Sequence, residues 1–179
     1  MGVSASTFAL LDYVWSRIRG RLNGMSDDEY LWEPVPGCWS VRARNGTWEV
    51  EREFPPPQPE PFTTMAWRTW HIGAEVIDGY LRRGFGAEAL ELEPQQWFPT
   101  AGQALAAMDD AWTAFSAAFH ELDDEAMAHL LGPDFGPWAE ANRNDMLLHV
   151  ADELIHHGAE VAMLRDLYTA SAGGRSWSP

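Results

Sequence analysis

Two side chains near the C-terminus have the types and the spacing to hold a metal ion. Glu153 and His157 lie four residues apart in HVADELIHHGAEV, residues 149–161. If this stretch is a helix, both side chains project from one face about one turn apart. A carboxylate and an imidazole placed in this way can grip one divalent transition metal. The alternative is a simple ion pair or hydrogen bond between the two side chains.

His71 is the candidate for a third ligand. It lies in WRTWHIG, residues 67–73, beside a predicted buried stripe, and an unpaired buried imidazole is costly. The members of that stripe recur every three or four residues: Trp67, Trp70, Ala74, Ile77 and Leu81. Three protein ligands would leave one coordination position open, which is the layout of a catalytic metal site.

Three neighbours of the Glu153–His157 pair are weaker candidates. His149, one turn before Glu153, could replace that ligand or hydrogen-bond to one. Glu160 could orient a ligand or carry a proton. His156 is expected to lie at the helix surface. No residue can be assigned a catalytic role from the sequence alone.

Long helices are needed to bring these residues together. Hydrophobic periodicity predicts four of them, over about residues 6–23, 63–83, 100–122 and 138–168, with a short helix near 124–131. Thr63 or Thr64 can cap the second helix, and Gly84 or Gly86 can end it. The first helix has this predicted apolar face: Leu10, Leu11, Val14, Trp15, Ile18 and Leu22. In the fourth helix, His157 falls on the predicted core stripe itself.

The connection between the first two helices has a different composition. Residues 34–61 are rich in proline, and Asn45-Gly46 lies between two runs of β-formers, which predicts a hairpin over residues 39–52. The sequence therefore predicts an all-α fold, a four-helix bundle whose long crossover between helices 1 and 2 carries a small β-hairpin. We expect one domain over residues 1–170 and a flexible tail over 171–179. Such bundles build metal sites from side chains on facing helices.

Charge and composition limit the partners. The chain has 179 residues, with 12 lysines and arginines against 27 acidic residues and a formal net charge of −15. That charge repels phosphate backbones and anionic lipids, so neither nucleic acid nor a membrane is expected as a partner. The N-terminal stretch lacks the pattern of a signal peptide, and the single cysteine, Cys38, excludes an intrachain disulfide framework. A soluble cytoplasmic protein acting on a small molecule is expected.

Three stretches of the chain, in this order, resemble the DinB-like superfamily of metal-binding four-helix bundles. They are LLDYVWSRIRGRLNGMSDDEYLWEPVPGCWSVR, WRTWHIG and DELIHHGAEVAMLRDLY. The superfamily includes mycothiol-dependent maleylpyruvate isomerase. Its members hold the metal with one histidine of the second helix and with two ligands of the fourth helix, which are commonly His-x-x-x-His. The resemblance places the metal ligands at His71, Glu153 and His157, with glutamate in place of the first histidine of the pair. Zinc is the first expectation for the metal, with nickel, iron or manganese as alternatives.

The resemblance also implies the chemistry. A low-molecular-weight thiol such as mycothiol would be the cosubstrate, and its thiolate would attack a small electrophile in an S-transfer or an isomerisation. Two other functions stay open at this point: metal-dependent hydrolysis, with Glu160 as candidate base, and a non-catalytic stress protein that binds a metal or a small ligand. A homodimer is implied by the resemblance alone.

Overall fold

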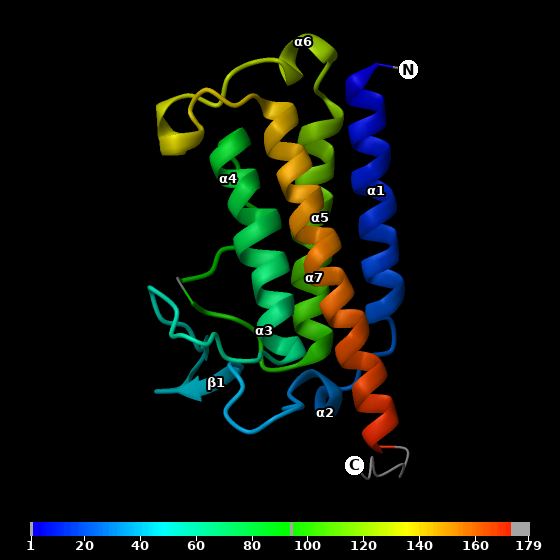
Figure 1. The fold of residues 1–179 in the computed structure, drawn as a ribbon, viewed down its shortest axis with the longest axis vertical. Helices are drawn as coiled ribbons and strands as arrows, with labels where there is room; N and C mark the ends of the chain where they lie inside the picture. The colour runs from blue at the N-terminus through cyan, green and yellow to red at the C-terminus, as the bar shows by residue number, and fades with distance from the viewer. Residues whose placement is uncertain (1, 94, 173–179) are drawn as a thin grey trace.

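Four long helical segments lie side by side in the computed structural model, which describes residues 2–93 and 95–172 (Figure 1). The first is α1 (Val3–Leu22), and the second is continuous through α3 (Met65–Trp70), η1 (His71–Asp78) and α4 (Gly79–Phe85). The third and fourth are α5 (Ala101–His120) and α7 (Arg143–Ala172). The prediction of an all-α four-helix fold is confirmed.

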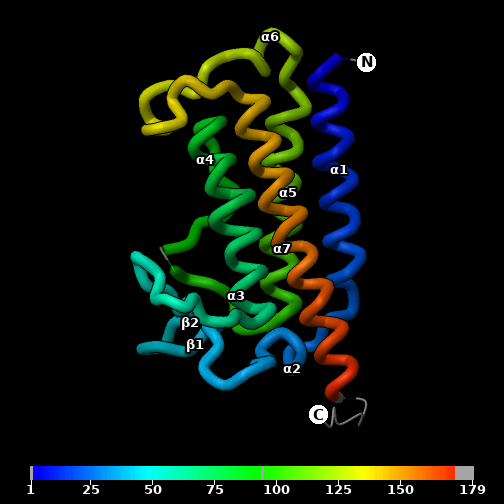
Figure 2. The backbone as a smooth tube through the Cα atoms, viewed as in Figure 1, coloured from blue at the N-terminus to red at the C-terminus, as the bar shows by residue number. Residues whose placement is uncertain are grey.

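The first two connections between these segments take different paths. Residues 23–64 start and end at the same end of the bundle, and they contain α2 (Asp27–Tyr30) and the hairpin of β1 (Val41–Arg44) and β2 (Thr47–Val50) (Figure 2). Residues 86–100 return from the end of α4 to the opposite end of the bundle, where α5 begins (Figure 1). The second segment and α5 therefore run in the same direction, and α1 and α7 run in the other.

Local chemistry explains several of the element ends. The Thr64 hydroxyl accepts a hydrogen bond from the backbone N–H of Trp67, so Thr64 is the cap of α3. Gly86 ends α4 with φ at +70°, a left-handed conformation that glycine adopts without steric cost. Asn45 and Gly46, at the tip of the predicted hairpin, have φ of 50° and 88°, as a type I′ turn requires.

The second helical segment departs from the predicted α-helical stripe. Residues 71–78 form a π-helix, which has a wider turn than an α-helix and so rotates the following side chains. Ile72 and Val76 are buried as a result, while Ala74 is only half-buried. Trp67, which precedes the π-helix, is also half-buried. In α1, Leu10 is exposed rather than part of the core, because it lies at the edge of the face that α7 and α5 cover.

The predicted fourth helix begins later than expected. Pro133–Trp138 is a short 3₁₀ helix, η2, in which Gly136 has φ of +54°, and α7 starts only at Arg143. The short helix α6 (Asp124–Met127) ends before the predicted residue 131. Helix α7 continues through residues 171 and 172, and the remainder of the predicted tail, residues 173–179, lies outside the described residues.

The connection over residues 86–100 is tied to the hairpin and to η1. Val50 donates its backbone N–H to Gln95, and Trp97 donates to Trp48. The buried Asp78 carboxylate accepts hydrogen bonds from the backbone N–H groups of Ala89 and Leu90. The hairpin and this connection therefore meet over one side of the second helical segment. Among the described residues, no helix combines the length and the hydropathy needed to cross a membrane.

Candidate metal centre

Three side chains from two facing helices converge on one point. The Nε2 atoms of His71 and His157 lie 3.4 Å and 3.2 Å from the same atom, Oε2 of Glu153. His71 comes from η1, whereas Glu153 and His157 come from α7. The two imidazole rings are 4.4 Å apart at their centroids and nearly perpendicular, and each turns its Nε2 atom toward the point of convergence.

The other nitrogen of each ring is held by a carboxylate. His71 Nδ1 lies 2.9 Å from Glu75 Oε2, and His157 Nδ1 lies 2.6 Å from Glu160 Oε2. A carboxylate only accepts hydrogen bonds, and in each ring the Nδ1 contact is shorter than the contact of Nε2 with Glu153, so the proton of each neutral ring is assigned to Nδ1. Arg68 Nη1 is also 3.2 Å from His157 Nδ1, but the carboxylate contact is shorter and decides the tautomer.

This tautomer leaves the central point surrounded by acceptors. With Nδ1 protonated, each neutral ring directs the Nε2 lone pair at a carboxylate oxygen that also has no proton to give. Such an arrangement is stable only if a cation lies among the three atoms or if a ring takes up a second proton. Two imidazole nitrogens and one carboxylate oxygen are a donor set that suits zinc and other divalent transition metals. The residues present therefore fit a metal ion.

Each of these two glutamates, Glu75 and Glu160, is in turn paired with an arginine. Arg52 Nη1 lies 2.6 Å from Glu75 Oε1, and Arg68 Nη2 lies 3.1 Å from Glu160 Oε1. Burial alone would raise the pKa of Glu75, but the hydrogen bond from His71 and the charge of Arg52 outweigh it and lower that pKa.

The pKa of Glu160 depends on the same balance of burial and charge. Burial acts to raise the pKa of Glu160, while the hydrogen bond from His157 and the charge of Arg68 lower it. Both outer carboxylates thus stay ionised and keep the Nδ1 protons in place. With neutral histidines, two arginines against three glutamates leave the cluster with a net charge of −1, which favours binding of a cation.

Aromatic packing fixes the orientation of His71. The Trp67 ring stacks on the His71 ring, with centroids 5.4 Å apart and an interplanar angle of 13°. Trp67 is itself anchored, because its indole N–H donates to the backbone carbonyl of Glu51 at 2.8 Å. The π-helical turn at residues 71–78 starts at His71 itself, and such turns are frequent at functional sites.

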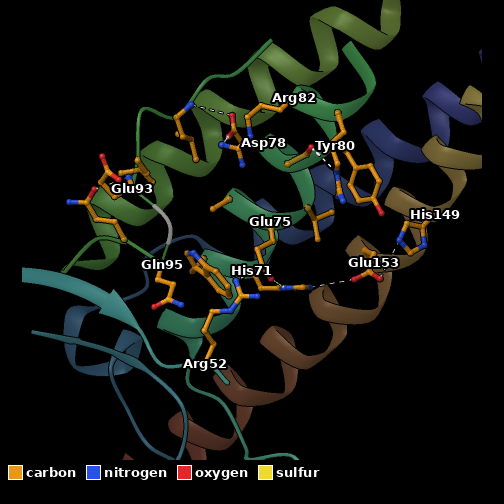
Figure 3. A pocket seen from close by; sticks show the side chains of 18 residues that line it. Arg52, His71, Glu75, Asp78, Tyr80, Arg82, Glu93, Gln95, His149 and Glu153 are labelled. Atoms are coloured by element: carbon orange, nitrogen blue, oxygen red, sulfur yellow. Dashed lines mark hydrogen bonds and ion pairs between the residues drawn. The ribbon is translucent and has the colours of Figure 1, made fainter. Parts of the chain in front are cut away.

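The convergence point opens into a cavity, hereafter the site cavity, of about 570 Å³ (Figure 3). His71 and Glu153 line it together with Arg52, Glu75, Tyr80 and His149. The side chains of His71, Glu153 and His157 are 19%, 27% and 13% exposed, so the centre is sheltered but reachable from solvent. A volume of this size is in the range of small-molecule sites.

The structure brings together most of the residues singled out from the sequence. His149 Nε2 lies 3.7 Å from Glu153 Oε1, on the wall of the site cavity, while Glu160 contacts His157. His157 is at the edge of the core rather than fully inside it, because its ring turns toward Glu153. His156 lies at the surface, 67% exposed, although it forms a second potential ligand group with His157 and Glu160. Arg68 is in contact with that second group, so its positive charge opposes a cation there.

Sequence reasoning missed Glu75, Arg52 and Arg68. Glu75 had a signal, since it lies four residues after His71 on the same helix. Arg52 follows β2 and reaches the site only through the fold of the hairpin. Cys38 is buried and donates its thiol to the carbonyl of Val35, and burial raises the pKa of that thiol. A buried thiol with a raised pKa is a poor nucleophile, so Cys38 is a structural residue.

Comparison with known proteins agrees with the resemblance noted in the sequence. No curated protein and no solved structure matched the chain significantly. A family model described as the DinB superfamily matches residues 10–161, a span that contains α3, η1 and the whole metal-ligand candidate set. The chain therefore belongs to the DinB superfamily.

Proposed function

We propose that this protein is a metal-dependent enzyme that joins a low-molecular-weight thiol to a small electrophile, as an S-transferase or a thiol-dependent isomerase. The observation that carries the proposal is the convergence of three acceptor atoms, from His71, Glu153 and His157, beside an open cavity. A bound divalent metal, zinc first and nickel, iron or manganese otherwise, would supply the positive charge that stabilises a thiolate.

The residues around the centre have definable tasks in this chemistry. His71, Glu153 and His157 would hold the metal, while Glu75 and Glu160 keep the two rings oriented. The site cavity would take the electrophile and the thiol. The thiol gives its proton to solvent and sulfur bonds to carbon. In an S-transfer, a leaving group then departs with its electron pair or the neighbouring carbon takes up a proton. In an isomerisation, the carbon–sulfur bond breaks again after rotation about the adjacent bond, and the thiol leaves and regains its proton.

One contact favours thiol chemistry over hydrolysis. A metal-dependent hydrolase needs a base near the attacking water, and Glu160 was the candidate from the sequence. In the structure, Glu160 faces the outer nitrogen of His157 and pairs with Arg68, so it lies behind the metal ligand rather than on the open side. An external thiol supplies the nucleophile without requiring that base.

Metal content is the first test. Protein purified without a histidine tag is expected to bind about one zinc ion per chain, measured by elemental analysis after incubation with zinc and removal of the excess. His71→Ala, Glu153→Ala and His157→Ala should each lose that ion, because two remaining ligands hold it too weakly. His156→Ala is the matched control on the same helix and should keep it, since His156 is a surface residue.

The second test separates the reaction classes. Zinc-loaded protein is assayed with a model electrophile, 1-chloro-2,4-dinitrobenzene, in the presence and absence of mycothiol. Product formation above the uncatalysed rate that needs both thiol and metal supports the proposal. A protein that binds no transition metal would overturn it, and so would a metal-loaded protein that hydrolyses esters at a rate independent of any thiol.

A further inference from the structure

A second cavity adjoins the site cavity and has a different character. This side pocket, of about 310 Å³, is lined mainly by apolar side chains, among them Leu131, Phe135, Trp138 and Met146. Tyr80 and His149 line both cavities, so the two are neighbours across a shared wall. The rings of Tyr80 and His149 pack edge to face, with centroids 5.5 Å apart, and His149 in turn contacts Glu153.

The outer wall of the side pocket is built by the segment before α7. Its two ends are tied, because Leu131 donates its backbone N–H to Ala141 and Gly132 donates to Ala139. Between these bonds, η2 presents Phe135 and Trp138 to the pocket. Trp138 is 70% exposed, so the hydrophobic core does not account for a large aromatic ring held at this position.

We propose that the side pocket binds an apolar arm, one aromatic ring or a short branched chain, of the same small molecule whose reactive end lies at the His71–Glu153–His157 centre. The proposal rests on the proposed function for the location of the reactive end. Its own basis is the contact between the two cavities, the apolar lining of the smaller one and the exposed ring of Trp138. Trp138 and Tyr80 are then specificity-determining residues, and substrates without an apolar arm are poor ones.

The chain offers an internal control for this site. A larger apolar groove, hereafter the α7 groove, lies between the C-terminal half of α7 and the segment before α3, and it contains Phe62, Met163 and Leu167. Phe62 is 69% exposed, which matches Trp138 in type and exposure. The methyl groups of Met146 and Met163 therefore report separately on the side pocket and on the α7 groove.

The first experiment needs no metal. Protein labelled with ¹³C at the methionine methyl groups, seven in the chain, is titrated with benzyl alcohol. Assignments come from Met146→Leu and Met163→Leu. A saturable shift of the Met146 signal with an unmoved Met163 signal is expected, because an aromatic ring bound in the side pocket lies beside Met146. A shift of Met163 alone, or of neither signal, would overturn the proposal.

The second experiment tests whether one ligand occupies both cavities. Zinc-loaded protein is titrated with acetohydroxamate, a chelating head without an arm, and with phenyl hydroxamates that carry one to three methylenes. The best arm is expected to tighten binding about 10- to 100-fold, the gain of burying one phenyl-sized group. Trp138→Ala should remove roughly 3- to 10-fold of that gain and leave acetohydroxamate unchanged. Phe62→Ala should change neither.

The outcomes separate this inference from the proposed function. If acetohydroxamate binds and no arm adds affinity, or if Phe62→Ala removes the gain instead of Trp138→Ala, the side pocket is not the site of the arm, although the metal centre stands. If no metal and no hydroxamate binds, the proposed function fails. The Met146 signal then still decides whether the side pocket takes an aromatic ring.

Discussion

A histidine that binds a metal through one ring nitrogen needs a contact on the other nitrogen to fix its tautomer and its orientation. In this protein the contact is a glutamate in both cases, Glu75 for His71 and Glu160 for His157. Each glutamate is backed by an arginine, Arg52 or Arg68. The two histidines thus have matching contacts at their outer nitrogens, although the contributing residues come from three parts of the chain: the end of the hairpin, the second helical segment and α7.

The outer glutamates should therefore matter for metal affinity without touching the metal. Glu75→Gln and Glu160→Gln are each expected to weaken zinc binding about 10- to 100-fold. The amide is a weaker acceptor than the carboxylate, and it can rotate to offer its NH₂ group to Nδ1, which releases the tautomer. Competition with a chromogenic zinc chelator measures the dissociation constant in each variant.

Asp152→Asn is the matched control for these variants. Asp152 is an exposed acidic residue of α7, next to Glu153, so its change removes the same charge without touching either ring. Its zinc affinity should stay within about twofold of the wild type, in keeping with the small effect of an exposed charge. Equal affinities in all three variants would show that the outer glutamates do not orient the histidines.

At the residue scale, the spacing of residues within a single helix was enough to predict most of the candidate site. The prediction of a helix is enough to place three of the residues on one face, within about two helical turns: Glu153, His157 and Glu160. Glu75 was within reach of the same reasoning, being four residues from His71. Arg52 and Arg68 were not, because their partners are set by how the hairpin and α7 pack against the second helical segment. No spacing rule covers contacts between elements that are far apart in the sequence.

Among the elements, the π-helical segment η1 has the largest effect on the site. Its wide turn buries Ile72, Gly73, Val76 and Ile77 and leaves His71 and Glu75 together on the open side. Gly73 makes this packing feasible. A Cβ atom at that position would lie 2.8 Å from the Trp97 ring and 3.0 Å from Met108 Cγ. The Trp97 ring cannot move away freely, because it is buried and its N–H donates to Thr69.

Gly73→Ala should therefore destabilise the protein despite the better helix propensity of alanine. Overpacking of a core costs about 1–3 kcal/mol, against a gain of up to about 1 kcal/mol from propensity. The expected net loss in the free energy of unfolding is about 1–2 kcal/mol, measured by urea denaturation. A shift of η1 should also weaken zinc binding through His71.

Gly20→Ala is the comparison for this change. Gly20 lies inside α1, and a Cβ atom there would meet nothing within 4 Å. Its substitution should raise the free energy of unfolding by about 0.5–1 kcal/mol. If the two variants behave alike, the contact of Gly73 with Trp97 does not constrain the helix.

At the element scale, the helices, their caps and the hairpin could be predicted, but not their detailed course. Periodicity located all four segments, and Thr64, Gly86 and Asn45-Gly46 act as expected. The π-helix could not be predicted, since a period-3.6 pattern fits the same residues and the close packing of Gly73 against Trp97 and Met108 involves residues distant in the sequence. The late start of α7 has a local cause at Asn142, whose side-chain oxygen accepts a hydrogen bond from the backbone N–H of Asp145, while the Asp145 carboxylate accepts one from the backbone N–H of Asn142.

At the scale of the whole molecule, two parts of α7 have different roles. Its middle presents the candidate ligands, and its C-terminal half is fastened to the end of α1 and to α2. There Arg165 forms two hydrogen bonds with the Glu29 carboxylate, at 2.6 Å and 3.0 Å, and also donates to the backbone carbonyls of Arg21 and Asn23. The Glu29 side chain is 6% exposed and that of Arg165 is 19% exposed, so this ion pair joins α7 to α2 in a position largely sheltered from water.

Loss of Glu29 should therefore destabilise the whole bundle. Glu29→Ala leaves the Arg165 guanidinium without its counter-charge in a sheltered position, and breaking a buried pair in this way costs about 3 kcal/mol. Asp166→Ala is the control, because Asp166 pairs with Arg21 at the surface and an exposed pair contributes less than about 1 kcal/mol. Urea denaturation of both variants measures the difference.

A double variant separates an unpaired charge from lost packing as the cause of that effect. Glu29→Met combined with Arg165→Met removes both charges and keeps most of the volume, so it should recover most of the stability that Glu29→Ala loses. Zinc affinity should follow the fraction of folded protein in both variants, because the pair lies away from His157. A double variant as unstable as Glu29→Ala would mean instead that the hydrogen bonds from Arg165 to the carbonyls of Arg21 and Asn23 hold α7 against α1.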